Sequence, residues 1–306
     1  MKKSDVYFQE IHKMTHFAEA IASAVEASGA TLLSDYEMFL MACDVYRAKV
    51  VKYLRGEYPS IEQYKRARAV LKDANIIAAD TDYSRLWRVV ARGKEAADEI
   101  VCSADPYCYI SHLSAMQRYG VTLRRPEALY ITRPTNEVVK NLIADRRAKD
   151  RPRLTFSQEV IGAPALLQVR HPRRVRGRNV SVKKTKFPGA FRPVRGSTVR
   201  VASIGQVFLD MLEDPKICGG MSHVLEVWDE HAQTYLKEIL QRVEEAGTDI
   251  AKVRAGYILS ERMSVSTKLL DVWVQHAQRG GSRKLDPDAD YAPRFSDKWM
   301  ISINVD

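Results

Sequence analysis

The 306-residue chain has few of the residues and motifs that mark a metalloprotein, a nucleotide-binding enzyme or a membrane protein. Its four cysteines, Cys43, Cys102, Cys108 and Cys218, show no paired spacing of the kind that zinc ligands have. A phosphate-binding glycine loop, a dinucleotide-binding glycine motif and a G-x-S-x-G nucleophile elbow are all missing. No stretch approaches 18 uncharged apolar residues. The sequence therefore predicts no metal, no cofactor and no membrane span.

The N-terminus also lacks a secretion signal, because no apolar run follows its two lysines. The rest of the composition is ordinary for a globular protein, with 45% hydrophobic and 28% charged residues and only 15 glycines and 12 prolines. Long disordered stretches are therefore not expected. A chain of this length should hold about two domains, each with its own core. We expect a cytoplasmic protein.

Positive charge is concentrated in one part of the chain. The formal net charge is +10, yet residues 146–200 alone carry sixteen lysines and arginines against Asp150 and Glu159, so the other residues sum to −4. Such localisation is typical of a surface that binds a polyanion, and the alternative is a solvated basic face on a strand-rich layer. The candidate second basic face, for DNA or for an acidic partner, consists of Arg170, Arg173, Arg174, Arg176, Arg178, Lys183, Lys184 and Lys186.

The first hundred residues have the order of a winged helix-turn-helix. Apolar residues at helical spacing predict a helix over 5–28, which we expect to pack on another domain or subunit. Further helices are predicted over 34–54 and 61–74, and strands over 76–79 and 86–90 with a turn between them. Helices followed at once by a β-hairpin are the order that this DNA-binding module requires.

Residues of the third helix and the hairpin have side chains suited to DNA. Amide and guanidinium groups read base edges in the major groove, and ammonium groups hold phosphates. The alternative is a structural helix and hairpin with ordinary surface charge. The candidate DNA-binding residues are Gln63, Tyr64, Lys65, Arg66 and Arg68 on the helix, with Arg85, Arg88 and Arg92 on the hairpin.

The remainder predicts an α+β fold: an N-terminal helix plus winged helix-turn-helix, then a mixed α/β C-terminal domain with a basic β layer and a helical C-terminal part. The expected domains are 1–95 and 96–306, the second divided into 96–202 and 203–306. Two helices are predicted within 93–122, with Pro106 between them, followed by a strand over 128–132 and a helix over 135–149. The basic β layer is predicted from strands over Leu166–His171, Asn179–Lys186 and Thr198–Ala202. Most of 204–278 is predicted to be helical, and a strand over 299–304 closes the chain.

Three groups of residues could carry chemistry, and each has a simpler structural interpretation. Ser111 and His112 could suggest a hydrolase, but adjacent helical residues point about 100° apart, so a helix-opening serine and a packing or hydrogen-bonded histidine are preferred. His223 and His231 lack an H-E-x-x-H motif and are interpreted as part of a solvated helix face. Asp210, if buried, needs a partner, and arginines are the candidates. We expect no enzymatic activity.

Two sequence words give the chain a family resemblance. Residues 201–221 read VASIGQVFLDMLEDPKICGGM, and residues 109–122 read YISHLSAMQRYGVT. Both resemble segments of the AbiEi-type antitoxins of type IV (abortive infection) toxin–antitoxin systems. The resemblance covers roughly residues 100–306 and is loose over the first hundred. It implies an N-terminal winged helix that represses the protein's own operon and a C-terminal domain that counters a nucleotidyltransferase toxin.

The predicted function is therefore that of a DNA-binding transcriptional repressor and antitoxin in phage defence. The predicted partners are operator DNA of its own operon and the cognate nucleotidyltransferase toxin. The toxin could be bound directly or countered functionally. On DNA the protein could be dimeric or bind cooperatively. The alternative is a protein that binds RNA, or processes RNA or DNA, through the basic face of residues 146–200.

Overall fold

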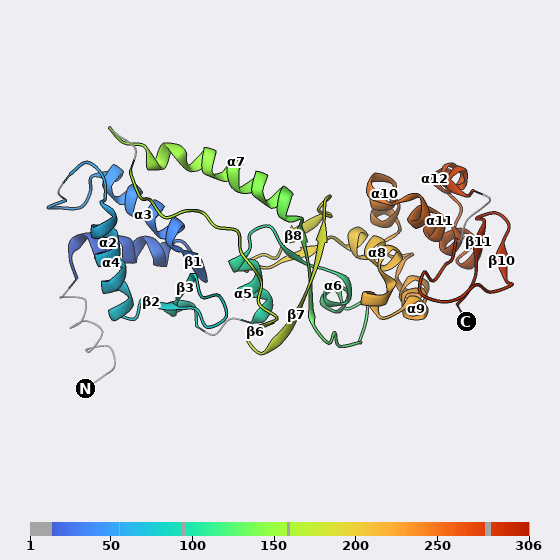
Figure 1. Ribbon diagram of the computed structural model, residues 1–306. Coiled ribbons are helices and arrows are strands. Elements are labelled where there is room, and N and C mark those ends of the chain that lie inside the picture. The colour runs from blue at the N-terminus through green and yellow to red at the C-terminus, as the bar shows by residue number, and fades with distance from the viewer. Residues whose placement is uncertain (1–13, 55, 94–95, 158–159, 279–282, 306) are drawn as a thin grey trace. The chain divides into compact units, whose positions relative to one another are not determined.

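The computed structural model describes residues 14–54, 56–93, 96–157, 160–278 and 283–305 (Figure 1). The chain has an α+β fold, as predicted. It forms two compact units, which are composed differently from the expected domains. Unit 1 comprises residues 1–108, 134–180 and 196–199, and unit 2 comprises residues 109–133, 181–195 and 200–306. Each unit is therefore assembled from segments that are distant in the sequence.

Unit 1 contains the predicted winged-helix order. Three helices and a small antiparallel sheet alternate along the chain, and the sheet has the strand order β1-β3-β2. Strand β3 is central, because Trp87 is paired with Leu33 on one side and with Ala79 on the other. The elements are α2 (His16–Ala27), β1 (Leu32–Ser34), α3 (Asp35–Ala48), α4 (Ile61–Asp73), β2 (Ile77–Ala79) and β3 (Leu86–Val89).

Two serines fix where the helices of the helix-turn-helix begin. The Ser34 hydroxyl accepts a hydrogen bond from the Glu37 amide (3.2 Å), and the Glu37 carboxylate accepts one from the Ser34 amide (3.0 Å). Ser60 and Gln63 repeat this capping box at the start of α4, at 3.1 and 2.8 Å. Such caps satisfy amides that have no partner within the helix, so they define the first turn of both helices.

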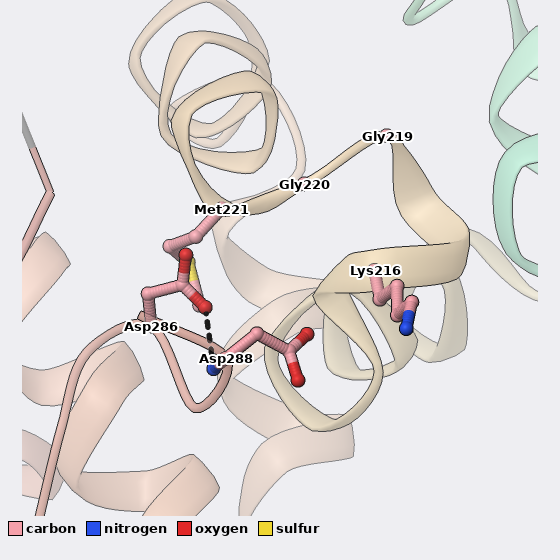
Figure 2. Close-up of a pocket in the computed structure, with 6 residues that line it drawn as sticks. All are labelled: Lys216, Gly219, Gly220, Met221, Asp286 and Asp288. Atoms are coloured by element: carbon pink, nitrogen blue, oxygen red, sulfur yellow. Dashed lines mark hydrogen bonds between the residues drawn. The ribbon is translucent and has the colours of Figure 1, made fainter. Parts of the chain in front are cut away.

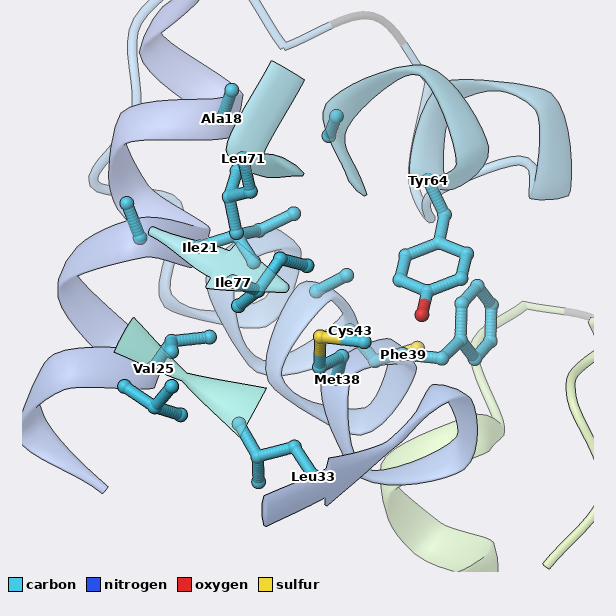
Figure 3. Packing of buried hydrophobic residues seen from close by; sticks show 14 of the residues in the cluster. Ala18, Ile21, Val25, Leu33, Met38, Phe39, Cys43, Tyr64, Leu71 and Ile77 are labelled. Atoms are coloured by element: carbon cyan, nitrogen blue, oxygen red, sulfur yellow. The ribbon is translucent and has the colours of Figure 1, made fainter. Parts of the chain in front are cut away.

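The core of the module shows that α2 belongs to it (Figure 3). Ile21 and Val25 of α2 are buried in the same cluster as Phe39, Leu71 and Ile77. The expectation that this helix packs on another domain or subunit is therefore wrong for the described residues, because α2 supplies one wall of the winged-helix core. The predicted helix began at residue 5, and residues 5–13 lie outside the described residues.

The module also recruits residues far beyond position 95. Val160 is buried in its core, and Leu154 and Phe156 pack against that core. The helix that precedes this segment, α7, carries Arg146, which binds Glu37 of α3 at 2.9 Å. The other elements of unit 1 are η1 (Val90–Arg92), α5 (Ala97–Ala104), α7 (Asn136–Leu154) and β6 (Arg174–Val175).

The strand predicted over Leu166–His171 is absent, since the structure assigns those residues to no helix or strand. Pro164 and Pro172 flank the segment and cannot donate to a sheet. Its residues instead use side chains: Gln168 donates to Asn136 (2.8 Å), and His171 lies between two polar partners that are described below. The apolar pattern of this segment therefore marks neither a strand nor a buried core segment, because Leu167 is 51% exposed and Leu166 is only half-buried.

A six-stranded mixed sheet has the order β6-β7-β5-β4-β9-β8. Strands β4 and β9 are parallel, with Ile110 beside Val201, whereas β4–β5, β6–β7 and β8–β9 are antiparallel. The predicted strand over residues 179–186 is confirmed as β7, and β5 confirms the one over 128–132. The strands are β4 (Tyr109–Ile110), β5 (Leu129–Pro134), β7 (Arg178–Thr185), β8 (Phe191–Pro193) and β9 (Arg200–Ala202).

The rest of unit 2 is mainly helical, as predicted. Its core includes Trp228, Trp273 and Trp299, all fully buried. Within the described ranges, no helix combines the length and apolar character needed to cross a bilayer. The elements are α6 (His112–Tyr119), α8 (Ile204–Glu213), η2 (Pro215–Cys218), α9 (Met221–His231), α10 (Leu236–Ala246), α11 (Asp249–Tyr257), η3 (Ile258–Arg262), α12 (Lys268–Trp273), η4 (Val274–His276), β10 (Phe295–Ser296) and β11 (Ile301–Ser302).

Candidate nucleic-acid interface

The outward face of α4 is the main candidate for contact with DNA. Glu62, Lys65, Arg66, Ala69 and Lys72 are exposed and recur at the spacing of one helical face. The opposite face carries the buried residues of the helix and packs into the winged-helix core. The helix therefore offers a polar surface that starts in its first turn, where recognition helices contact base edges.

Two of the predicted DNA contacts on α4 have structural roles instead. Tyr64 is 2% exposed, and its hydroxyl donates to the Asp35 carboxylate at 2.7 Å. Burial raises the pKa of Tyr64, so the phenol stays neutral. Gln63 forms the capping box, and its side-chain oxygen also accepts from the Tyr46 hydroxyl (3.2 Å). Tyr64 has no surface left for a ligand, so its assignment as a DNA contact is corrected by its burial.

Arg68 is also held inside the module. Its guanidinium donates to the Asp35 carboxylate and lies 5.1 Å from the centroid of the Trp87 ring. Asp35 therefore binds both Arg68 and Tyr64, which links the start of α3 to the middle of α4. Of the five predicted residues on α4, Lys65 and Arg66 are exposed to solvent.

Because Arg68 is bound to Asp35 whereas Lys65 and Arg66 are exposed, their replacement should affect stability differently. Arg68→Ala should lower the free energy of unfolding by about 1–3 kcal/mol, because it leaves the partly buried Asp35 carboxylate without its cation. Lys65→Ala and Arg66→Ala, on the exposed face, should change stability by less than about 0.5 kcal/mol. Urea denaturation of the three variants checks this, and equal stability of all three would show that the Asp35 pair contributes nothing.

The wing between β2 and β3 is fixed by carboxylates. Asp80 accepts from the amides of Asp82 and Tyr83 (3.0 and 2.9 Å), and both aspartates bind Arg176. Burial opposes ionisation of Asp80, but the Arg176 guanidinium and the two amides together hold its pKa below 3.8. Of the predicted wing residues, the structure places Arg85 and Arg92 on the surface and Arg88 half-buried on β3.

The residues of the predicted second basic face are divided between the two units, and two of them are paired with carboxylates. Arg176 is bound by the wing carboxylates, which removes it from that face. Lys183 binds Asp214 at 2.8 Å. The exposed members are Arg170, Arg173 and Arg174 in unit 1 and Lys183, Lys184 and Lys186 in unit 2, whereas Arg178 is half-buried.

Part of the charge of residues 146–200 is therefore neutralised within the fold. Arg146 is paired with Glu37, and Arg153 donates from Nε to Asp44 at 3.2 Å. These acidic partners lie far away in the sequence, so the local excess of +14 overstates the charge that is open to a polyanion. The cations that remain exposed in this segment stay a candidate surface for a polyanion.

In unit 2 the two family-like words meet in a buried polar cluster. The first word supplies Ser111 and His112, and the second supplies Asp210 and Asp214. The His112 ring lies 2.7 Å from the Ser111 hydroxyl through Nδ1 and 3.5 Å from the Asp214 carboxylate through Nε2. The Ser111 oxygen also accepts from the Thr132 hydroxyl at 2.8 Å. Segments about eighty residues apart are thus joined through their polar residues.

This cluster supports a structural role for its members. Ser111 and His112 are 0% and 2% exposed, and the histidine is hydrogen-bonded as preferred. The two side chains do not point apart as predicted, because Ser111 has an extended backbone and precedes the helix. Asp210 is buried, but the expected arginine partner is wrong, because its carboxylate accepts from the Gln206 amide (2.6 Å) and Arg242 binds Gln206 instead (2.6 Å). Burial raises the pKa of Asp210, and the nearby His112 imidazole opposes that rise.

Asp214 makes the stability of unit 2 dependent on pH. Its hydrogen bond with His112, against burial and with help from Lys183, lowers the pKa of Asp214 from 3.8 to about 2. A lowered pKa contributes stability above the unfolded value, and this stability is lost as pH falls from about 4 to about 2. Asp214→Asn should remove at most roughly 2 kcal/mol at pH 7 and flatten that acid limb.

Denaturation between pH 2 and 7 checks this prediction. Asp297→Asn, at an exposed carboxylate of the same unit, is the control and should keep the wild-type profile. An unchanged acid limb in Asp214→Asn would contradict the role given to the His112 contact.

Unit 2 also has a surface pocket of about 620 Å³ (Figure 2). The glycine turn of the second word forms one side of it, and an acidic loop faces that turn. The Asp286 carboxylate accepts from the Asp288 amide at 2.9 Å, so it orders its own loop. The lining residues are Lys216, Gly219, Gly220, Met221, Asp286 and Asp288.

The two histidines of α9 are not equivalent. His223 is 6% exposed and lies 2.9 Å from the Thr122 hydroxyl and 3.2 Å from the Glu226 carboxylate. The prediction of a solvated helix face is therefore wrong for His223, which joins α9 to the end of the first word. His231 is half-buried beside Glu230 at 3.7 Å.

One group of possible ligands was missed in the sequence. Asp105, Cys108 and His171 each place a donor atom within 4.8 Å of the other two. All three belong to unit 1, and the side chains of Asp105 and His171 are 1% and 2% exposed. No spacing rule finds this group, because His171 is 63 residues from Cys108.

Comparison with known proteins adds little. No family model matches the chain, and no curated protein matches it. The structure is similar to the crystal structure of the RV2827C protein from Mycobacterium tuberculosis, with 11% sequence identity, a TM-score of 0.48, and coverage of 94% of this chain and 92% of that one.

Proposed function

We propose that the chain is a DNA-binding transcriptional repressor that also acts as the antitoxin of a type IV toxin–antitoxin system, against a nucleotidyltransferase toxin. The observation that carries the DNA-binding part is the position of α4, which is packed through one face into a winged-helix core and exposes Lys65 and Arg66 on the other. A helix held in this way fits the major groove of DNA.

The composition of the exposed face favours recognition of sequence over simple attraction to phosphate. Lys65, Arg66 and Lys72 are accompanied by Glu62 and Asp73, so the face is only weakly positive. A guanidinium group can read guanine and a carboxylate can accept from cytosine, while a carboxylate also disfavours wrong contacts with phosphate. Phosphate contacts would then come from the wing, where Arg85 is exposed.

The antitoxin part rests on the resemblance of residues 109–122 and 201–221 to AbiEi-type antitoxins. It gains support from the buried cluster, because His112 of one word contacts Asp214 of the other. If this chain and the antitoxins share a fold, the two motifs should lie together in that fold, and the contact between His112 and Asp214 meets this condition. The toxin partner, and whether it is bound or countered indirectly, belong to this proposal.

The repressor proposal is tested with the full chain and two duplexes of equal length, one from upstream of its own gene and one with that sequence shuffled. Binding should favour the upstream duplex and weaken with salt, with a log–log slope of about 0.9 for each phosphate neutralised. Equal affinity for both duplexes would contradict a sequence-specific repressor.

The antitoxin proposal has its own test. Co-expression of the full chain with a nucleotidyltransferase encoded beside it should restore growth to cells that the transferase inhibits. Continued inhibition, with both proteins soluble, would contradict the antitoxin role and would leave the DNA-binding result unaffected.

A second candidate function is the binding of single-stranded nucleic acid by the end of β7 and the loop that follows it toward β8 (the β7–β8 loop). Phe187 is 86% exposed, and Lys184 and Lys186 beside it are exposed as well. An aromatic ring among cations is the combination that stacks bases and holds a single-stranded backbone. Affinity for single-stranded RNA that falls in Phe187→Ala would favour this candidate.

A further inference from the structure

We propose that Asp105, Cys108 and His171 form a binding site for a divalent metal ion of the zinc class, beneath the wing of unit 1. The three residues come from two segments of that unit. Asp105 and Cys108 lie in the turn that follows α5, and His171 lies in the irregular segment that follows α7. The site is independent of the proposed DNA-binding function.

The Asp105 carboxylate is already oriented for a metal. Its Oδ1 accepts from the Tyr107 amide at 3.0 Å, which turns Oδ2 toward His171. The distance from Oδ2 to His171 Nε2 is 3.1 Å. Oxygen and nitrogen ligands of a tetrahedral zinc ion lie about 3.4 Å apart, given bonds of about 2.0–2.2 Å. This pair therefore needs a shift of only a few tenths of an ångström.

The Cys108 sulfur completes the group. All three donor atoms lie within 4.8 Å of one another, and a zinc-bound sulfur and nitrogen lie about 3.6 Å apart. Cys108 is 0% exposed, and its thiol now donates to the carbonyls of Val101 (3.6 Å) and Asp105 (3.3 Å). Both carbonyls also accept a backbone amide, from Asp105 and Cys108 respectively, so loss of the thiol proton leaves neither without a donor.

The charges of the three residues balance a divalent ion. On binding, Cys108 releases its proton to solvent and becomes a thiolate, so that thiolate, carboxylate and neutral imidazole together carry −2 against +2. A site buried to this degree favours such neutrality over separate charges. Sulfur and imidazole donors select zinc and related ions over magnesium or calcium, and three protein ligands leave a fourth position for water.

Tyr83 acts as a positioning residue for this site. Its hydroxyl lies 2.8 Å from His171 Nδ1, and the two rings pack edge to face with centroids 6.0 Å apart. In the metal-free protein Nε2 donates to the Asp105 carboxylate, which can only accept. On metal binding the imidazole proton moves from Nε2 to Nδ1 by exchange with solvent, where the Tyr83 oxygen accepts it, and the Nε2 lone pair becomes free for the metal. Because Tyr83 belongs to the wing, a bound ion would tie the wing to the segment that holds His171.

The test uses the full chain, freed of metal with a chelator and then titrated with cobalt(II) as a spectroscopic probe of a zinc site. The expected result is one equivalent of bound cobalt, with a sulfur-to-cobalt charge-transfer band and the visible bands of a four-coordinate ion. Zinc should displace the cobalt, and adding zinc should raise the Tm of the apoprotein. A wild-type chain with no thiolate–cobalt band would overturn the proposal without any variant.

Matched variants locate the ligand. Cys108→Ser should abolish the charge-transfer band, whereas Cys102→Ser, at another buried cysteine six residues earlier, should keep it. Tyr83→Phe should keep the band and weaken affinity about 10–100-fold, the usual effect of removing an outer partner of a metal-bound histidine. A band that survives in Cys108→Ser and disappears in Cys102→Ser would place the metal elsewhere and overturn the assignment.

Discussion

The double variant Lys65→Glu/Arg66→Glu will bind the upstream duplex at least about 100-fold more weakly than the wild type. Removing a base or phosphate contact from a recognition helix costs about 1–3 kcal/mol, and two new carboxylates facing DNA add repulsion. Both residues are exposed on α4, so the substitutions leave the winged-helix core intact. Fluorescence anisotropy with the labelled duplex at fixed salt gives the ratio of the two Kd values.

The control has the same change in net charge at a different place. Lys237 and Lys268 are exposed on helices of unit 2, and Lys237→Glu/Lys268→Glu should retain affinity within about threefold, because side chains that do not contact DNA act on it only through electrostatics screened by salt. If both double variants weaken binding to the same extent, the DNA contact is a diffuse effect of net charge, and the assignment of α4 is incorrect.

The variant Gly256→Ala will lower the free energy of unfolding of unit 2 by about 3 kcal/mol or more. A methyl group at Gly256 would overlap the six-membered ring of Trp299. That ring cannot move aside, because Trp299 is fully buried and its Nε1 donates to the Ser260 hydroxyl at 2.8 Å. Overpacking typically costs about 1–3 kcal/mol, and a rigid, hydrogen-bonded neighbour places this site at the upper end. Urea denaturation measures the change.

A double-mutant cycle separates this clash from any general effect of alanine. Trp299→Phe removes the part of the ring that faces Gly256 and leaves a void, which the new methyl group of Gly256→Ala then fills. The double variant should therefore be more stable than the sum of the two single changes predicts, by about 1 kcal/mol or more. Additive effects would show that the two residues do not constrain each other.

Local sequence signals predicted the winged-helix elements well. Ser34 and Ser60 mark the start of two helices, because a capping box depends only on residues three positions apart. The sequence also identified the surface of α4 in part, since Lys65 and Arg66 are exposed. The sequence-based assignment of Tyr64 as a DNA contact was wrong, because the residue type alone does not show whether a tyrosine on a helix faces the solvent or the core.

Interactions between distant segments account for the other differences. Arg176 was counted toward a basic face, but its partners Asp80 and Asp82 lie more than ninety residues earlier in the chain. Asp105 and His171 are likewise brought together by the fold alone. Charge runs and ligand spacings describe neighbours in sequence, so neither could foresee these pairs.

Acetylation of lysines with and without the upstream duplex, measured for each lysine by mass spectrometry, shows whether α4 contacts DNA. We predict that DNA slows the modification of Lys65 at least several-fold while Lys184, Lys186 and Lys237 react as before. An unchanged rate at Lys65, with protection of Lys184 and Lys186, would contradict a DNA contact through α4 and would place nucleic acid on the β7–β8 loop.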